Sequence, residues 1–170
     1  MSKIYQRIEL TANVLIIVVA ILIVGVVVQR YRSSPPPAPQ SKAPAIGSKV
    51  SLPDVDLSKS NKNVLLVLQK GCHFCSESAE FYKRLIAETK GRNVNIVAVL
   101  PQDKSEAEEY LNSLGIQGVG VRQSRLDSLS VSGTPTIIVL NNRGEIAAVW
   151  VGKLPLETEN EVLAKLNSQT

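Results

Sequence analysis

Two cysteines, Cys72 and Cys75, are the residues whose type and spacing point most directly to chemistry, and they are the only cysteines among 170 residues. Thiols three positions apart can form a disulfide with each other. An apolar run at residues 64–68 precedes them and predicts a buried strand, and residues 76–85 predict a helix. A cysteine at the start of a helix lies beside unpaired backbone N–H groups and the positive end of the helix dipole, which stabilise a thiolate. The pattern therefore indicates thiol–disulfide exchange.

Metal or haem binding by the same residues fits the sequence less well. A structural zinc site normally needs four ligands, whereas the chain offers two cysteines and a single histidine, His73, which lies between them. A c-type haem attachment needs histidine directly after the second cysteine, where this chain has Ser76. An inert structural disulfide would close too short a loop to remove much entropy from the unfolded chain. Metal binding and an inert bridge remain the alternatives to redox activity.

The N-terminal region predicts a membrane anchor. Residues 10–28 are apolar apart from Thr11 and Asn13, a length that can cross a hydrocarbon core of about 30 Å as one helix. The run is longer than the apolar region of a cleaved signal peptide, and it ends without a small-residue cleavage site. We therefore expect an uncleaved signal anchor over residues 10–29, preceded by a short flank at residues 1–9.

A proline-rich stretch within residues 30–46 predicts an extended spacer between this anchor and the rest of the chain. The remaining residues, 47–170, suit one folded domain of ordinary size. Positive charges flank both ends of the anchor, so the positive-inside rule does not decide its orientation. We expect the domain on the periplasmic or other extracytoplasmic side of a bacterial inner (cytoplasmic) membrane, because a single N-terminal span with almost no preceding chain usually carries its C-terminal domain across the membrane.

The net charge of +4 is concentrated beside the anchor, since the segment before Ser33 carries +3 of it. The folded region is therefore nearly neutral and has no basic patch that would favour binding to nucleic acid. It also contains neither an internal repeat nor a phosphate-binding glycine loop. The cysteine pair remains the main functional signal.

The rest of the domain predicts an α/β fold. Strands are expected at residues 94–100, near Val121, at 136–140 and at 145–151, helices at 105–114 and 157–166, and a hairpin turn at 141–144. With the elements around the cysteines, the order is strand, helix, strand, helix, three strands and a helix. This order predicts a central mixed β-sheet with helices on both faces.

A family resemblance appears in the segment Val131–Thr136, which contains Gly133-Thr134-Pro135. A proline directly before a strand cannot donate to the ladder and belongs in a turn, sometimes with a cis bond. Together with the CxxC about sixty residues earlier, and with the adjoining sequence TIIVLNNRGEIAAVWVG, this segment resembles the thioredoxin superfamily. Within it, the chain is most similar to membrane-anchored thiol–disulfide oxidoreductases of the TlpA/ResA type, over residues 50–166. The likeness includes a long insertion, residues 101–131, that plain thioredoxins lack.

The resemblance implies a thioredoxin-like fold in which Pro135 is cis and packed beside the cysteine pair. Thr134 would then offer its backbone to a bound peptide. Cys72 would be the exposed attacking thiol and Cys75 the buried resolving thiol. A redox-active disulfide of this kind requires no further cofactor and no metal.

The chain departs from the family pattern at several positions near the pair. Gly71 replaces the tryptophan that usually precedes the first cysteine, and Phe74 is expected to take over part of that surface. Leu66 stands where thioredoxins carry a buried acid, and Ser78 stands where TlpA-type proteins often carry glutamate. The base that deprotonates the second cysteine is therefore unassigned.

Other residues around the pair have more open roles. His73 and Phe74, between the cysteines, are expected to contact the substrate. His73 and Lys70 bring positive charge near the first cysteine, which would favour its thiolate, although a bystander role for Lys70 is equally open. Glu77 and Glu80 do not match the position of the family's acid, and both are expected on solvated helix surface.

The leading interpretation is a reductase of protein disulfides outside the cytoplasm. Its substrates could include apo forms of c-type cytochromes, and a membrane protein would supply its electrons. A disulfide-forming oxidase or isomerase would use the same residues with a different redox poise. A chaperone that binds Cu(I) through both cysteines is the alternative from another functional class.

Overall fold

The computed structural model describes residues 15–25, 43–50, 52 and 55–168. The chain divides into two compact units, Met1–Gln40 and Ser41–Thr170. In the first unit, residues 15–25 form a helix of apolar residues and one glycine, all of them exposed. Among the described residues, no helix is both long and apolar enough to span a bilayer. The rest of the predicted anchor over residues 10–29, and residues 30–42 of the predicted linker, lie outside the described residues.

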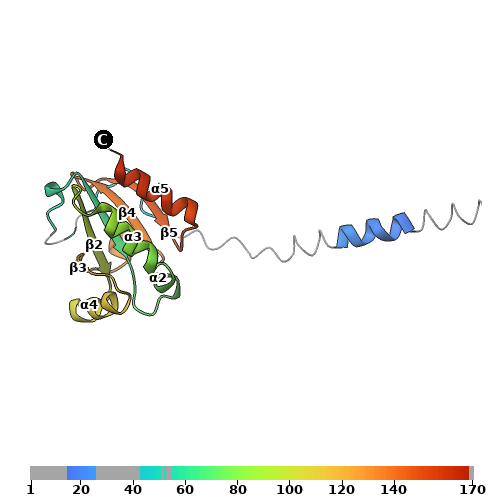
Figure 1. Cartoon of the computed structure of the whole chain (residues 1–170), viewed down its shortest axis with the longest axis horizontal. Helices are drawn as coiled ribbons and strands as arrows, with labels where there is room; N and C mark the ends of the chain where they lie inside the picture. The colour runs from blue at the N-terminus through green and yellow to red at the C-terminus, as the bar shows by residue number, and fades with distance from the viewer. Residues whose placement is uncertain (1–14, 26–42, 51, 53–54, 169–170) are drawn as a thin grey trace, which may run out of the picture. The chain divides into compact units, whose positions relative to one another are not determined.

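The second unit contains every strand and α-helix that the sequence predicts, with bounds that differ by a few residues (Figure 1). The strands are β1 (Lys62–Val67), β2 (Val94–Leu100), β3 (Gly120–Gln123), β4 (Thr136–Asn141) and β5 (Ile146–Val151). The α-helices are α2 (His73–Glu77), α3 (Ala79–Thr89), α4 (Lys104–Ser113) and α5 (Leu156–Asn167), and the 3-10 helices are η1 (Leu57–Lys59) and η2 (Asp127–Leu129).

The five strands form one mixed sheet in the order β3-β2-β1-β4-β5, as the predicted mixed sheet requires. Strand β1 is parallel to β2, and β2 is parallel to β3, whereas β4 is antiparallel to both β1 and β5. In the β1–β4 register, Val67 at the end of β1 pairs with Thr136 at the start of β4. The segment after Val67 and the segment before Thr136 therefore leave the sheet at the same end of the strands.

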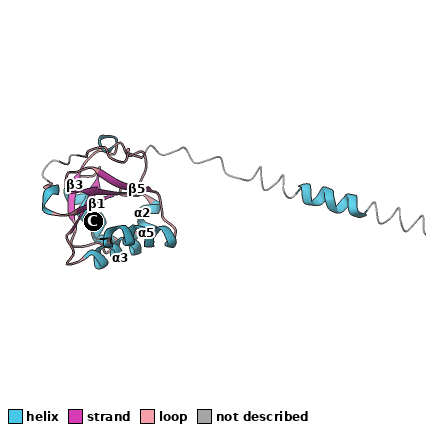
Figure 2. Ribbon diagram, turned by 90° about the horizontal axis from the view of Figure 1, so that it is seen from above, coloured by secondary structure: helices cyan, strands magenta, loops and turns pink. Residues whose placement is uncertain are grey.

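Each face of the sheet has its own core, because successive side chains of a strand point to opposite faces. In β1, Val64 and Leu66 face the core that α2, α3, α4 and α5 cover. Leu65 and Val67 face the second core, which η2 and the segments around η1 cover with residues such as Leu129. Figure 2 shows α3 and α5 on the same side of the sheet.

The α-helices α2, α3, α4 and α5 therefore all cover one face of the sheet, and among the described residues only 3-10 helices lie on the other face. The predicted helices on both faces are correct only in that limited sense. The chain steps from β1 to β2 and then from β2 to β3 in the same direction across the sheet. Parallel crossovers are nearly always right-handed, so two successive steps in one direction place both of their helices, α3 and α4, on the same face. The segment after β3 then returns across the opposite face before β4 begins.

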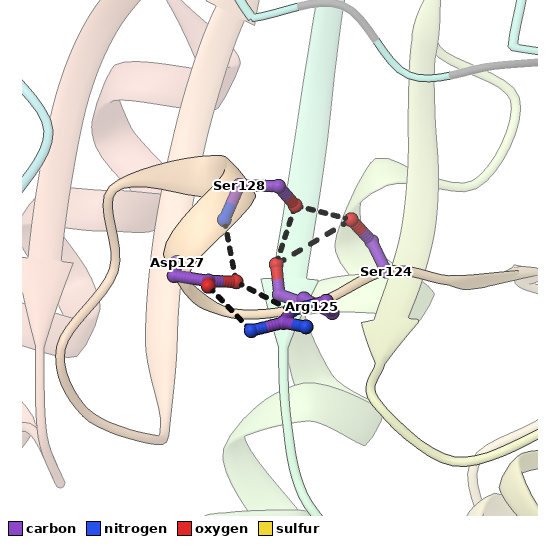
Figure 3. A network of polar contacts seen from close by, with 4 residues as sticks. All are labelled: Ser124, Arg125, Asp127 and Ser128. Carbon is purple, nitrogen blue, oxygen red and sulfur yellow. Dashed lines mark hydrogen bonds and ion pairs between the residues drawn. The ribbon is translucent and has the colours of Figure 1, made fainter.

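A polar network holds that returning segment in shape (Figure 3). The Ser128 hydroxyl donates to the carbonyl oxygen of Arg125 at 2.6 Å and lies 2.9 Å from the Ser124 hydroxyl. The Arg125 guanidinium forms an ion pair with Asp127 at 2.8 Å. These contacts are exposed, and they close the turn that places buried Leu129 against the sheet. The chain then continues directly into the segment before β4.

The turn between β4 and β5 receives the N-terminal end of the domain. The backbone N–H of Val50 donates to the carbonyl oxygen of Gly144 at 2.8 Å, and Lys49 forms an antiparallel bridge with Glu145. Gly144 has a φ of +75°, and a Cβ atom at this position would lie 2.9 Å from the carbonyl oxygen of Val50. Glycine is therefore required here both by the backbone conformation and by the close approach of the neighbouring segment.

Candidate functional site

Cys72 and Cys75 form a disulfide just beyond the end of β1, with their Cα atoms 5.2 Å apart. Cys72 is the N-cap of α2, so the predicted position of a cysteine at a helix start is correct. The backbone N–H of Cys75 donates to the Sγ atom of Cys72 at 3.2 Å. In the reduced protein, a hydrogen bond of this kind favours the Cys72 thiolate over the thiol.

The two cysteines differ in access to solvent. Cys75 is 0% exposed and belongs to the core beneath the helices, whereas Cys72 is only partly buried. Between them, His73 and Phe74 are exposed, Phe74 to 52%. An external disulfide can therefore approach Cys72, while Cys75 can be reached only through Cys72.

The segment before β4 forms the other wall of the site. The Thr134–Pro135 peptide bond is cis, as the resemblance implies. The carbonyl oxygen of Thr134 lies 3.3 Å from the Sγ atom of Cys72. On its far side, the carbonyl oxygen of Pro135 accepts a hydrogen bond from the backbone N–H of Gly152 at 2.7 Å, which ties this segment to the loop after β5. The structure thus brings Cys72, Thr134 and Pro135 together.

Ser78 interrupts the helical run after the cysteines, and it separates α2 from α3. Its side chain is buried, and its hydroxyl donates to the carbonyl oxygen of Phe74 at 2.8 Å. Leu66, at the other position where the family carries an acid, is fully buried among apolar residues. Neither position supplies a carboxylate, so the base for Cys75 stays unassigned.

Tyr82, one turn after Ser78, is the largest fully buried side chain near the pair, at 1% exposed. It belongs to the same core as Cys75. Burial raises the pKa of Tyr82 far above its ordinary value, since the phenolate would be left without solvent. Its hydroxyl therefore keeps its proton at neutral pH and cannot act as a base for the buried thiol.

Glu77 is exposed on the helix surface, as the sequence predicts, but its carboxylate has partners there that the sequence does not signal. Its carboxylate accepts a hydrogen bond from Lys153 Nζ at 2.9 Å, and its other oxygen lies 3.1 Å from His73 Nε2. The hydrogen bond from Lys153 is the main cause that lowers the pKa of Glu77 below its ordinary value. Glu80 pairs with Lys83 on its own helix and is 87% exposed, so the prediction for this residue is correct as well.

Lys70 is also paired with an acidic side chain. It forms an ion pair with Glu106 of α4 at 2.8 Å, and this hydrogen bond raises the pKa of Lys70 above its ordinary value. Sequence reasoning missed both this pair and the contact of Lys153 with Glu77. The partners lie 36 and 76 residues apart, and no local pattern signals such pairings.

Among the described residues, no group of three or more His, Cys, Asp or Glu side chains is placed to hold a metal ion. The described part of the site consists of a disulfide, a neighbouring carbonyl oxygen and a set of surface ion pairs. This arrangement can exchange one disulfide for another through sulfur chemistry alone.

Comparisons with known proteins support the fold. No protein-family model matches the chain, and no curated protein matches it. Among solved structures, the thioredoxin domain of a thiol–disulfide oxidoreductase from Bacteroides vulgatus matches with a TM-score of 0.59 at 18% identity, covering 74% of this chain and 100% of that one. A thiol–disulfide isomerase from Corynebacterium glutamicum matches with a TM-score of 0.54 at 20% identity, covering 79% and 97%.

StoA from Bacillus subtilis also matches, with a TM-score of 0.51 at 18% identity, covering 61% of this chain and 82% of that one. At these identities the likeness concerns the fold. The chain has the thioredoxin-like α/β fold found in solved thiol–disulfide oxidoreductases, and it carries a CxxC disulfide.

Proposed function

We propose that this protein is a membrane-anchored thiol–disulfide oxidoreductase that reduces disulfides of other proteins outside the cytoplasm. The observation that carries the proposal is the Cys72–Cys75 disulfide at the start of α2, in which one sulfur is accessible and the other is buried. Thr134, whose carbonyl oxygen approaches the accessible sulfur, supplies the adjoining backbone.

The mechanism depends on this asymmetry. In the reduced protein, the Cys72 thiolate attacks one sulfur of a substrate disulfide and forms a mixed disulfide, while the second substrate sulfur leaves as a thiolate and takes up a proton. The Cys75 thiolate then attacks Cys72 Sγ, restores the internal disulfide and releases the remaining substrate thiol. The substrate gains two electrons and two protons, and the cysteine pair loses them.

Substrate binding would use the surface around Cys72. An extended peptide can pair with the backbone at Thr134, since this segment lies directly beside the reacting sulfur. His73 and Phe74, both exposed between the cysteines, would contact the side chains of that peptide. Phe74 would thereby supply part of the apolar surface that tryptophan provides in relatives.

The anchor and the electron supply are further parts of the proposal. The apolar helix at residues 15–25, with no buried residue, supports a membrane-embedded segment over residues 10–29, and the proline-rich linker would hold the domain away from the bilayer. A reductase outside the cytoplasm needs electrons, so a membrane protein that carries them across the bilayer is the expected partner. Apo forms of c-type cytochromes are one substrate class with cysteines that must be reduced.

The reduction potential of the cysteine pair tests the direction of electron flow. A value near or below about −270 mV, as in thioredoxin, would support a reductase supplied with electrons from the membrane. A value approaching about −120 mV would instead identify a disulfide donor, the second candidate function. That candidate gains support from the similar fold of a protein described as a thiol–disulfide isomerase. The measurement requires equilibration of the protein with glutathione or dithiothreitol buffers and quantification of its free thiols.

A further inference from the structure

Glu77 connects two parts of the site that are distant in the chain. It lies at the end of α2, and its two carboxylate oxygens have different partners. One oxygen lies 3.1 Å from Nε2 of His73, the residue directly after Cys72. The other accepts a hydrogen bond at 2.9 Å from Lys153, in the loop between β5 and α5. Both partners are groups that can carry positive charge.

The loop that holds Lys153 also supports the opposite wall of the site. Its Gly152 donates a backbone hydrogen bond to Pro135 at 2.7 Å. The neighbouring Thr134 places its carbonyl oxygen 3.3 Å from the Cys72 sulfur. Glu77 therefore joins the helix that begins at Cys72 to the loop that fixes the segment before β4.

The charges of Glu77 and Lys153 affect the stability of a thiolate at Cys72 in the reduced protein. The Glu77 carboxylate is ionised at neutral pH, and it compensates the charge of Lys153. Glu77 ends the short helix α2, whose N-cap is Cys72, and Lys153 contacts Glu77 at that end. A positive charge near a thiolate at Cys72 stabilises the thiolate, and a negative charge destabilises it. Because a stabilised thiolate favours the dithiol over the disulfide, the balance of these two charges acts on the redox equilibrium.

We propose that Glu77 is a positioning residue: its carboxylate contacts the His73 side chain and compensates the charge of Lys153. It thereby sets how strongly the thiolate of reduced Cys72 is stabilised. The inference rests on the proposed thiol–disulfide chemistry, but it concerns the equilibrium of the pair rather than its substrates.

The test measures the equilibrium between the cysteine pair and glutathione in four proteins: wild type, Glu77→Gln, Lys153→Met and the double variant. Glu77→Gln leaves Lys153 uncompensated and should shift the equilibrium toward the dithiol by about threefold. Lys153→Met leaves the Glu77 charge uncompensated and should shift it toward the disulfide by about the same factor. The double variant should lie near wild type.

A matched control is available on α3, where Glu80 pairs with Lys83 on the helix surface. Glu80→Gln breaks an exposed ion pair whose two residues both belong to α3, and it should leave the equilibrium unchanged. High salt should reduce the opposite shifts of the two single variants, because it screens exposed charges. A purely structural effect of these substitutions would not respond to salt in this way.

Shifts of the two single variants in the same direction, or no shift in either while both remain folded, would overturn the role of Glu77. The glutathione equilibrium can be measured whether or not the protein reduces other proteins. A failure of the proposed function would appear instead as wild-type protein that equilibrates with glutathione but does not reduce protein disulfides.

Discussion

The carbonyl oxygen of Thr134 lies 3.3 Å from the Sγ atom of Cys72, although 62 residues separate them in the chain. The antiparallel pairing of β1 with β4 produces this contact, because Val67 at the end of β1 pairs with Thr136 at the start of β4. The segments that carry Cys72 and Thr134 therefore leave the sheet side by side. A peptide that pairs with the backbone at Thr134 would therefore present its own disulfide to the accessible sulfur.

The different exposure of the two cysteines predicts different outcomes when each is replaced. Cys72→Ala should abolish exchange with protein disulfides, because the remaining Cys75 is 0% exposed. Cys75→Ala should still attack substrates but should accumulate mixed disulfides, since no second thiol can resolve them. Non-reducing gels and mass spectrometry of each variant, incubated with a disulfide-containing protein, would detect the adducts. Full turnover by Cys75→Ala would contradict these roles.

Phe74 should contribute to the binding of protein substrates. Its side chain is 52% exposed in the free protein, and covering this apolar surface in a complex would favour binding. Phe74→Ala should raise KM for a protein disulfide by about fivefold and leave the reduction of a small aromatic disulfide unchanged. The comparison of both substrates separates lost binding from damage to the cysteine pair.

Ile46 offers the control for this substitution. It is 73% exposed and precedes Gly47, whose backbone bonds to Ile146 at the start of β5, the end of that strand away from the cysteines. Ile46→Ala should leave KM for both substrates unchanged. An equal rise in KM for the protein disulfide in both variants would show that Phe74 makes no specific contact with the substrate.

Much of this site can be predicted from local sequence signals. The apolar run before the cysteines forms β1, Cys72 caps a helix, and Pro135 precedes a strand, so each signal is complete within a few residues. The break at Ser78 was not anticipated, because the continuous helical pattern contains no proline or glycine at that point. Its buried hydroxyl bonds back to the preceding turn instead.

Long-range features could not be predicted in the same way. The ion pair of Glu77 with Lys153 depends on how α2 meets the loop after β5, and neither residue alone signals the other. The placement of α3 and α4 on one face depends on strand order, since β3 lies outside β2 rather than on the far side of β1. The order of elements along the chain permits either arrangement.

Tyr82 should make the stability of the domain sensitive to alkaline pH. Burial raises its pKa in the folded state above the ordinary value of 10.0 that applies to the unfolded chain. The folded protein therefore retains a proton that the unfolded chain releases, so this contribution is fully present below about pH 10 and is lost as the pH rises further. The loss approaches about 1.4 kcal/mol for each pH unit above that value.

Tyr82→Phe removes this titration. The free energy of unfolding of the variant should decline less steeply than that of wild type above about pH 10, while the two should run parallel below about pH 9. Urea titrations followed by the fluorescence of Trp150, the single tryptophan, would measure both slopes. Parallel decline of the two proteins at alkaline pH would show that Tyr82 does not retain its proton.

Gly144 should be more sensitive to substitution than a glycine with the same backbone conformation in open space. Gly144 and Gly118 both have a φ of +75°, so alanine at either position should cost about 1 kcal/mol from the backbone alone. At Gly144 the added Cβ atom would lie 2.9 Å from the carbonyl oxygen of Val50, whereas a Cβ atom added at Gly118 would meet no heavy atom within 4 Å beyond its chain neighbours. Gly144→Ala should therefore cost a further 1–3 kcal/mol, roughly, from overpacking.

Urea unfolding of the Gly144→Ala and Gly118→Ala variants, compared with wild type, would give the difference. The same steric conflict should loosen the segment at Lys49 and Val50, because its hydrogen bond to residue 144 and its bridge to Glu145 require the close approach. Limited proteolysis should then cleave near Lys49 faster in Gly144→Ala than in Gly118→Ala. Equal losses of stability and equal cleavage rates would mean that the N-terminal segment moves aside at no cost.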